Sequence, residues 1–436
     1  MNKRNLFRFL VFLFLITGSG ANIFAHPMPN SIVILKIHEK NISGEIQLPL
    51  GELQSAIGMN VNDNSVRLLE RLGDTLQIYL LNHIRPKTLD GKPWQVKLGE
   101  MEVVETKSQL SGEYKELLVA FSITPPLHYD LRNFYFDYDV ILHQVASHKA
   151  LITIKQDWQQ GIFHEDSTTQ EVGVIEWDVV NNQLKPFQIS LEQGSNWKGF
   201  KSMFFLGTKH IAEGTDHLLF LLVLLLPIPL LINNKKWANH RSVKQSLINI
   251  LKIVTAFTIG HSITLLFGAL GWVTLPSKPI EIIIGISILV SAFHAIKPIF
   301  AKKEIYIALG FGLIHGLAFA YTLADLSLSS SKMVLSILGF NLGIEVMQML
   351  VIIAVIPWLI LLSRTSIYTI FRVLCAFLAI IAASAWILER ISEKQNVVTE
   401  SINTITSQNW WIYVVFIAFS MIIYYFEKSK KQEIIS

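Results

Sequence analysis

The pattern of hydrophobic and polar positions divides the chain into two parts. Between residues 26 and 199, short runs alternate between apolar and polar positions and are separated by turns rich in Gly, Asn, Asp and Pro. Such period-two runs predict half-buried strands, and their spacing favours an all-β, sandwich-like antiparallel domain. The predicted strands are Ser31–Ile37, Gly44–Leu48, Thr75–Leu81, Glu116–Ile123, Tyr135–Leu142, Ala150–Ile154, Val172–Val179 and Phe187–Leu191, with a helical pattern at Asn64–Leu72.

Long apolar runs replace this alternation from about residue 203 onward. Most of them approach or exceed the ~20 residues that a helix needs to cross a hydrocarbon core. The runs are Met203–Ile232, Leu247–Trp272, Ile280–Phe300, Ile305–Ala324, Val334–Leu362, Ile367–Leu388 and Trp410–Phe426. The sequence therefore predicts an α-helical polytopic membrane bundle of about seven transmembrane helices over residues 200–430.

Residues 1–25 have the order of a secretory signal peptide. Basic residues, among them Lys3 and Arg8, precede the apolar run Phe9–Ile16, and small residues lead to Ala25. This run is too short to span a bilayer, so we expect cleavage after Ala25, with an uncleaved anchor as the alternative. In either case the domain at 26–199 is exported.

Basic residues support one orientation of the bundle. With the N-terminal domain outside, the expected inner loops and tail hold Lys235, Lys236, Arg241, Lys244, Lys302, Lys303, Arg364, Arg372, Lys428, Lys430 and Lys431. The expected outer loops are poorer in cations, as the positive-inside rule requires. We therefore expect a multi-pass protein of the cell inner (cytoplasmic) membrane, with a periplasmic or extracellular N-terminal domain and a cytoplasmic C-terminus.

Composition excludes several classes of protein. Charged residues make up 16% of the chain and hydrophobic residues 51%, whereas soluble proteins carry about 25% charged residues. The net charge of +4 is too small to indicate nucleic-acid binding. Cys375 is the single cysteine, which excludes an internal disulfide framework and a cysteine-rich metal site.

Ionisable residues inside the predicted spans provide the candidate chemistry. A charge at the centre of a membrane helix costs at least ~2.5 kcal/mol and so needs a partner. Three acids and four histidines lie at similar predicted depth: Glu213, Asp216, Glu345, His210, His217, His261 and His315. Nitrogen and oxygen ligands without thiolate suit nickel, cobalt, zinc or copper, so we expect a divalent transition metal whose identity stays open. His294 lies closer to the inner face.

Spacing within the spans ranks these ligands. His210, Glu213 and His217 share one face of a continuous helix, but His210 and His217 are then about 10.5 Å apart along its axis. Glu213 with His217 is therefore the better chelating pair, and Asp216 is expected to orient a ligand.

Two further groups complete the candidate ligands. In the fifth span Asn341, Glu345 and Gln348 form a second polar stripe. His26 would follow the cleaved signal and could chelate copper through its amine and ring.

Several ordered motifs resemble those of the HupE/UreJ family of membrane proteins. They are His210-x-x-x-Gly214-x-Asp216-His217, Gly260-His261-Ser262-x-Thr264, His315-Gly316-Leu317-Ala318 and Asn341-Leu342-Gly343-x-Glu345. The exported domain is similar to that of the longer branch of the family. The resemblance implies nickel or cobalt uptake serving hydrogenase or urease, with His210, Asp216, His217 and His315 as primary metal ligands. Ile211 departs from the family pattern, which usually has Pro there.

Three functions fit these observations. The first is a divalent-metal permease with its site near the bilayer midplane. The second is an intramembrane zinc hydrolase, with three histidines on the metal and Glu345 or Glu213 as the base. The third is a membrane assembly or sensory factor whose exported domain binds an exported protein partner. The lipid bilayer is a partner in all three, and nucleic acid in none.

Overall fold

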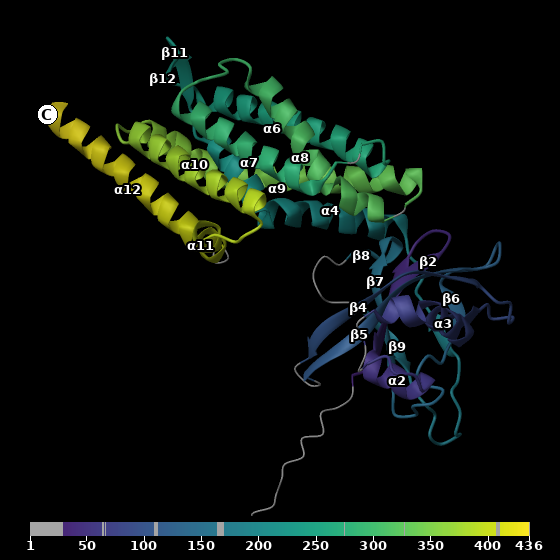
Figure 1. Cartoon of the computed structure of the whole chain (residues 1–436). Helices are drawn as coiled ribbons and strands as arrows, with labels where there is room; N and C mark the ends of the chain where they lie inside the picture. Colours follow the sequence, from purple (N-terminus) through teal and green to yellow (C-terminus); the bar gives the residue numbers. More distant parts are fainter. Residues whose placement is uncertain are drawn as a thin grey trace, which may run out of the picture. The chain divides into compact units, whose positions relative to one another are not determined.

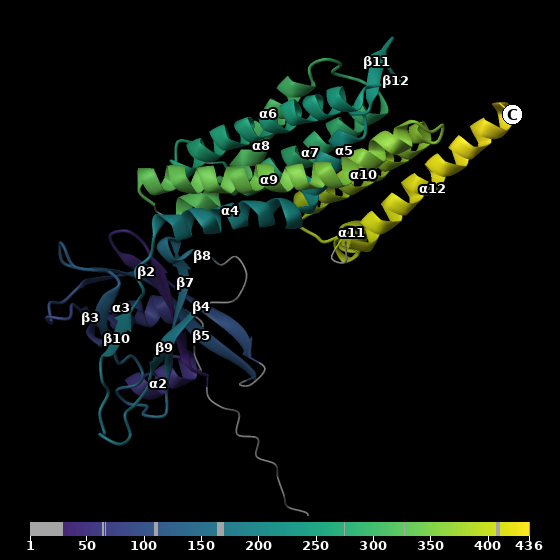
Figure 2. The same ribbon diagram turned by 180° about the vertical axis from the view of Figure 1, so that it is seen from behind.

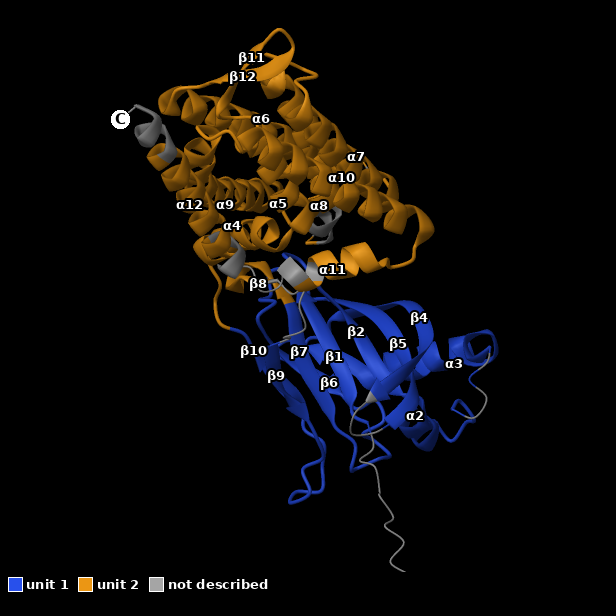
Figure 3. Ribbon diagram, turned by 90° about the vertical axis from the view of Figure 1, so that its left-hand side faces the viewer, with its two compact units in different colours: residues 1–155, 167–191 blue, residues 156–166, 192–436 orange. Residues whose placement is uncertain are grey.

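The structure is a computed structural model that describes residues 29–62, 65, 67–108, 112–163, 170–273, 275–326, 328–406 and 410–435. The predicted signal peptide and His26 lie outside the described residues. Two compact units are present (Figure 3). A β-rich unit comprises Met1–Lys155 and Ser167–Leu191, and a helical unit comprises Gln156–Asp166 and Glu192–Ser436.

An antiparallel sheet, most of which belongs to the β-rich unit, has the strand order β4-β5-β2-β1-β7-β8, and β9 also pairs with β7. The strands are β1 (Ser31–Ile37), β2 (Ile42–Pro49), β4 (Gln95–Ser108), β5 (Gly112–Thr124), β7 (Ala150–Asp157), β8 (Ile162–Phe163) and β9 (Gln170–Ile175). Side chains of β1 alternate between buried and half-buried, and Val33 and Leu35 are fully buried. The alternation of apolar and polar residues in this segment therefore corresponds to the buried and less buried faces of the strand.

A smaller sheet and two helices complete this unit. The sheet has the order β10-β6-β3, from β3 (Ile84–Lys87), β6 (Asn133–Tyr138) and β10 (Phe187–Ser190). The helices are α2 (Leu50–Ile57) and α3 (Leu68–His83). The predicted strand Thr75–Leu81 is wrong, because it lies within α3. Leu76 and Leu80 are buried one helical turn apart, a spacing that was mistaken for alternation.

A buried polar group connects separate parts of the β-rich unit. Nε2 of His148 lies 2.7 Å from Oγ of Ser31 and accepts the Ser31 N–H at 3.3 Å, while its Nδ1 lies 3.4 Å from Glu52 Oε2. Because the site is desolvated, the pKa of His148 falls to about 4 and the pKa of Glu52 is raised. His148 is therefore neutral at neutral pH, with its proton on Nδ1.

The helical unit contains a bundle of apolar helices that run alongside one another (Figures 1 and 2). Its elements are η1 (Trp158–Gln160), α4 (Asn196–Glu213), α5 (Thr215–Leu225), β11 (Leu230–Asn233), β12 (Lys236–His240), α6 (Val243–Ala269), α7 (Ser277–Ile296), α8 (Glu304–Asp325), α9 (Ser330–Ser363), α10 (Tyr368–Ser392), α11 (Val397–Thr406) and α12 (Trp410–Ile435). In both views α12 lies at an edge of the bundle.

Four helices of the described chain, α6, α7, α9 and α10, are long and apolar enough to cross a membrane. Each coincides with a predicted span, and shorter apolar helices occupy Thr215–Leu225 and Glu304–Ala320. The protein is thus a multi-pass membrane protein with a β-rich N-terminal region, and the total of seven crossings stays a prediction. The predicted span Met203–Ile232 is not one helix, since α4, α5 and β11 divide it.

Glycines allow two pairs of helices to pack backbone against backbone. A Cβ on Gly312 of α8 would lie 2.0 Å from the carbonyl oxygen of Phe257 on α6, and a Cβ on Gly316 would lie 2.2 Å from that of His261. Between α4 and α9, a Cβ on Gly207 would lie 2.0 Å from the carbonyl oxygen of Phe340. Small residues at helix crossings permit this close approach in membranes. Residues near these crossings are consequently held at short range.

Candidate metal centre

A helix break at Gly214 shapes the candidate site. The α4 helix ends at Glu213 and α5 begins at Thr215, with Gly214 between them in an extended conformation (φ −69°, ψ 92°). As a result the rings of His210 and His217 approach to 4.6 Å between centroids, in an edge-on arrangement. The expected separation of about 10.5 Å along one continuous helix is therefore wrong. The break brings together two histidines that an unbroken helix would keep apart.

Asp216 fixes the tautomer of His217. Its Oδ1 lies 2.9 Å from Nδ1 of His217, and a carboxylate accepts hydrogen bonds, so Nδ1 carries the proton. The Nε2 atom of His217 then has a free lone pair and is buried without a hydrogen-bond partner. A carboxylate that holds one imidazole nitrogen while the other faces a metal is the usual arrangement around metal-binding histidines.

Ser287 fixes the tautomer of His315 in a similar way. The Ser287 hydroxyl donates its single proton to the carbonyl oxygen of Ile284 at 2.7 Å, so it must accept from Nε2 of His315 at 3.0 Å. Nδ1 of His315 therefore has the free lone pair, and it is also buried without a partner. The rings of His217 and His315 lie 5.0 Å apart. In its neutral form, each of these two histidines thus presents one unprotonated nitrogen.

His261 and His210 extend the same cluster. Their ring centroids are 6.5 Å apart, and His261 is fully buried. Across the four histidines, five buried ring nitrogens have no hydrogen-bond partner in the described part of the chain: His210 Nε2, His217 Nε2, His261 Nδ1, His261 Nε2 and His315 Nδ1. Leaving a buried polar atom unpaired costs about 1–3 kcal/mol, so native proteins contain few. Their concentration in one place points to a ligand.

Aromatic side chains enclose the histidines. Phe319 and Phe340 stack on each other at 4.3 Å and lie 5.0 and 5.4 Å from the His210 ring. Phe220 and Phe257 lie 5.2 and 5.1 Å from the His315 ring. This shell surrounds the imidazoles with apolar side chains, and a low-polarity environment strengthens electrostatic interactions inside it.

The cluster is a chain of close histidines and not a closed coordination shell. Within the described ranges, no three His, Cys, Asp or Glu side chains converge to hold one ion. The spacing of 4.6 to 6.5 Å between neighbouring rings leaves pairs of imidazoles as the units that contact an ion. The residues therefore fit a metal ion that is contacted by one pair of imidazoles after another.

The predicted chelating pair of Glu213 and His217 is not formed. The Glu213 side chain is 66% exposed, and its carboxylate lies 3.7 Å from Nζ of Lys209. The prediction assumed a continuous helix, and the break at Gly214 removes the i, i+4 relation on which it rested. His210 takes the place that Glu213 was expected to have beside His217.

The polar stripe of α9 contacts α6 at Thr255 and Thr258. Thr255 Oγ1 donates to Glu345 Oε1, and Thr258 Oγ1 to Gln348 Oε1, each at 3.4 Å. Thr255 lies about 9 Å along the α6 axis from His261. Asn341 is buried, and its amide nitrogen donates to Ile337 at 2.9 Å while its Oδ1 has no partner among the described residues.

His294 lies outside the cluster. Its Nδ1 accepts the N–H of Ile299 at 3.2 Å, and its ring stacks on Phe300 at 3.8 Å. Its main-chain carbonyl accepts the indole N–H of Trp237 at 3.0 Å. These contacts close the turn that follows α7.

A polar cavity of about 330 Å³ borders the cluster at Asp216. Four carboxylates line it: Glu213, Asp216, Glu281 and Glu389. The other lining residues are Gly214, Thr215, Ile284, Gly285, Ile288, Trp386, Arg390 and Thr399. Arg390 forms an ion pair with Glu281 across this space. The acids outnumber the single arginine, so the cavity favours cations.

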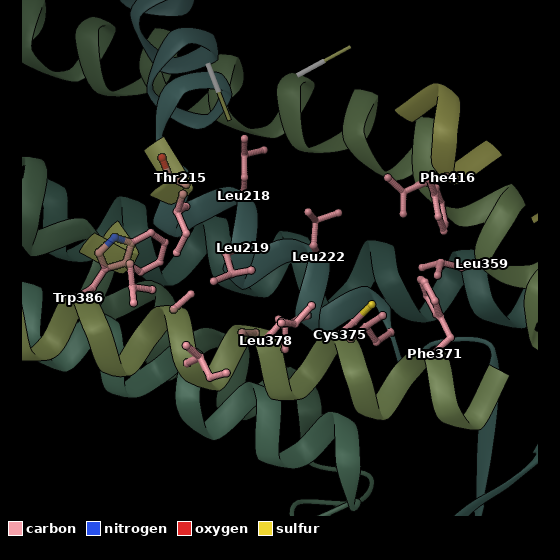
Figure 4. A pocket seen from close by; sticks show the side chains of 18 residues that line it. Thr215, Leu218, Leu219, Leu222, Leu359, Phe371, Cys375, Leu378, Trp386 and Phe416 are labelled. Atoms are coloured by element: carbon pink, nitrogen blue, oxygen red, sulfur yellow. The ribbon is translucent and has the colours of Figure 1, made fainter. Parts of the chain in front are cut away.

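A second cavity, of about 630 Å³, is almost entirely apolar. Figure 4 shows Leu218, Leu219 and Leu222 of α5 on one side and Phe371, Cys375 and Leu378 of α10 on the other. Thr215 and Trp386 line both cavities. Hydrocarbon walls cannot replace the hydration shell of an ion, so of these two cavities the polar one offers a cation an approach to Asp216.

Ser287 and two acids of the polar cavity, Glu281 and Glu389, were not predicted from the sequence as site residues. Ser287 is a small polar residue in an apolar span, a weak signal that many packing serines share. Glu281 lies near the end of a predicted span, where water can solvate a carboxylate, and the folded chain places it in the same cavity lining as Asp216.

Residues 187–390 of this chain match the family model whose description is HupE / UreJ protein. No curated protein matches the chain. The matched range contains the Gly214 break and all four clustered histidines.

Proposed function

We propose that this chain, which belongs to the HupE/UreJ family through residues 187–390, is a permease for a divalent transition metal such as Ni²⁺ or Co²⁺. The family is associated in general with nickel and cobalt uptake. The metal is the cargo, and the clustered histidines His210, His217, His261 and His315 are its binding site inside the membrane. Asp216 and Ser287 orient two of the rings.

The observation that carries this proposal is the set of five unpaired imidazole nitrogens. His217 Nε2 and His315 Nδ1 are unprotonated by the hydrogen bonds on their other nitrogens, and their rings lie 5.0 Å apart. Neutral imidazole is a ligand that nickel, cobalt, zinc and copper accept. An ion at this position would satisfy atoms that otherwise cost about 1–3 kcal/mol each.

Polar side chains continue on both sides of the cluster. The acidic cavity reaches Asp216 on one side, and Gln348 with Thr258, then Glu345 with Thr255, follow along α6 and α9 on the other. Polar groups that can contact a cation therefore continue beyond the histidines along α6 and α9. Several weak sites in series suit conduction, since an ion must leave each site as readily as it enters.

A resident catalytic zinc is less well supported. Such a metal needs three protein ligands around one point, and in the described part of the chain no three such side chains converge. Glu345, the base of the hydrolase alternative, is bonded to Thr255, about 9 Å along α6 from His261. The geometry favours transit of an ion over hydrolysis at a fixed one.

The proposed orientation follows from the sequence. We place the β-rich unit outside the inner membrane, after an N-terminal signal peptide, with the C-terminus in the cytoplasm, because the basic residues gather in the inner loops. The Glu281 and Glu389 carboxylates of the polar cavity then lie at the outer ends of α7 and α10. Cations would enter from outside.

The test is uptake of radioactive Ni²⁺ and Co²⁺ by cells that carry equal amounts of wild type, His217→Ala or His240→Asn in the membrane. We expect uptake to fall to background in His217→Ala, because it removes the central ring of the cluster. His240 is exposed in β12 and serves as the control, with wild-type uptake. Unchanged uptake of both ions in His217→Ala would overturn the proposal.

A further inference from the structure

Two histidines of the β-rich unit are far apart in the sequence but stack on each other in the structure. His83 is the last residue of α3, and His143 lies in the turn after β6. Their ring centroids are 4.2 Å apart, with 25° between the planes. Tyr79, one helical turn before His83, contacts both rings at 4.5 and 5.7 Å.

Asp139 fixes the same tautomer in both rings. Nδ1 of His83 lies 2.7 Å from Oδ1 of Asp139, and Nδ1 of His143 lies 3.1 Å from the main-chain oxygen of Asp139. Both oxygens can only accept a hydrogen bond, so both Nδ1 atoms carry the proton. Each Nε2 atom then has a free lone pair on the edge of its ring turned away from Asp139.

The backbone is strained to hold this arrangement. Ile141 has a φ of +66°, a left-handed conformation that is rare for a β-branched residue, and its side chain is fully buried. Its N–H donates to the Tyr79 hydroxyl at 3.0 Å, and the Asp139 N–H donates to the His83 carbonyl oxygen at 3.1 Å. Such strain persists where the surroundings impose it, and it concentrates at functional sites.

We propose that His83 and His143 bind a divalent transition metal through their two Nε2 atoms, with water in the remaining positions. Imidazole nitrogens in this tautomer suit Ni²⁺, Co²⁺, Cu²⁺ and Zn²⁺. Asp139 has the role that carboxylates and carbonyls commonly have behind metal-binding histidines, and Arg85 holds its other oxygen at 2.9 Å. The site is a pair, consistent with the absence of any three-ligand group among the described residues.

The two rings are close enough to share one ion. Two nitrogens on adjacent positions of one ion, with bonds of about 2.0–2.1 Å, are about 3 Å apart. The ring centroids are 4.2 Å apart, so binding requires the two Nε2 atoms to turn toward a common point. His83 is a fifth exposed, so solvent and ions reach it. A site with two protein ligands and bound water exchanges its ion readily, as a capture site requires.

The inference is independent of transport, and its test keeps the two apart. The full-length chain in detergent is dialysed against Ni²⁺, and bound ions per chain are counted for wild type, His83→Gln, His143→Phe and His217→Ala. Phe keeps the aromatic stack on His83 but has no nitrogen. We expect His83→Gln and His143→Phe each to lose one exchangeable ion per chain that His217→Ala retains.

The control is His128→Asn, an exposed histidine of the same unit at φ +71°, a conformation that Asn tolerates. It should bind as many ions as wild type. Hydrogen exchange of β6 verifies that the variants keep the local fold. Wild-type Ni²⁺ binding in both His83→Gln and His143→Phe would overturn the inference, whatever the result of the uptake experiment.

Discussion

The substitution Gly214→Ala tests whether the helix break creates the candidate site. A Cβ at this position would lie 2.5 Å from the His210 carbonyl oxygen and 3.1 Å from Nδ1 of His217. The first distance is far inside van der Waals contact, so the present backbone cannot keep an alanine. Alanine also favours helix over glycine by about 1 kcal/mol. We therefore expect α4 and α5 to join into one helix.

The size of the resulting displacement follows from helix geometry. Seven residues of continuous helix separate His210 from His217 by about 10.5 Å along the axis, where the structure has 4.6 Å between ring centroids. Two nitrogens on one ion can be at most about 4 Å apart, twice a bond of 2.0–2.1 Å. His210 and His217 could then no longer contact the same ion.

Two measurements and one control variant decide the outcome. Ni²⁺ uptake and Ni²⁺ binding by the purified chain should both fall in Gly214→Ala to the level of His217→Ala. Gly310→Ala makes the same chemical change in α8, where no atom lies within 4 Å of the added Cβ, and should behave as wild type. Cys375, the only cysteine, is partly buried, so its reactivity with a maleimide on heating verifies that each variant is folded. Wild-type affinity in a folded Gly214→Ala would refute the reasoning.

Two further predictions concern single hydrogen-bonded groups. Ser287→Ala removes the acceptor that keeps the proton of His315 on Nε2, so we expect the affinity for Ni²⁺ to drop by about 10–100-fold. The drop would be measured as a higher half-saturating Ni²⁺ concentration in uptake. An unchanged half-saturating concentration would show that Ser287 does not contribute to the site. In the β-rich unit, His148 stays neutral down to about pH 4, whereas the unfolded chain binds a proton there below about pH 6.5. The β-rich unit should therefore lose at most about 3 kcal/mol of stability as the pH falls from about 6.5 to about 4, and the raised pKa of Glu52 partly offsets this loss. Hydrogen exchange of β1 should consequently depend less on pH in His148→Asn than in wild type.

The hydrophobic pattern correctly predicted the elements that have one buried face or one long apolar run. Val33 and Leu35 alternate with half-buried neighbours in β1, and the apolar runs that became α6, α7, α9 and α10 are long enough to need no further evidence. The strand expected at Thr75–Leu81 failed because Leu76 and Leu80 fit both periods over so short a window. Only the packing of a whole helix distinguishes the two.

The candidate ligands were predictable as residue types but not as neighbours. The free-energy cost of ionisable side chains in a membrane drew attention to His210, His217, His261 and His315, and the structure places all four in one cluster. Glu213 was chosen over His210 because spacing on an ideal helix was the only geometry that the sequence offered. A break depends on the local conformation of one glycine, and glycines in membrane helices more often serve close packing.

Glycine therefore belongs to the site as much as histidine does. The spacing of His210 and His217 would separate these residues on any continuous helix, so the proposed metal site depends on the extended Gly214 between them. Gly316 allows the backbone of α8 to touch the carbonyl of His261, next to His315. Ligand distances in the cluster thus depend on where the backbones can approach. A substitution at Gly316 changes no ligand, yet it should alter these distances and with them which divalent ion the proposed site prefers.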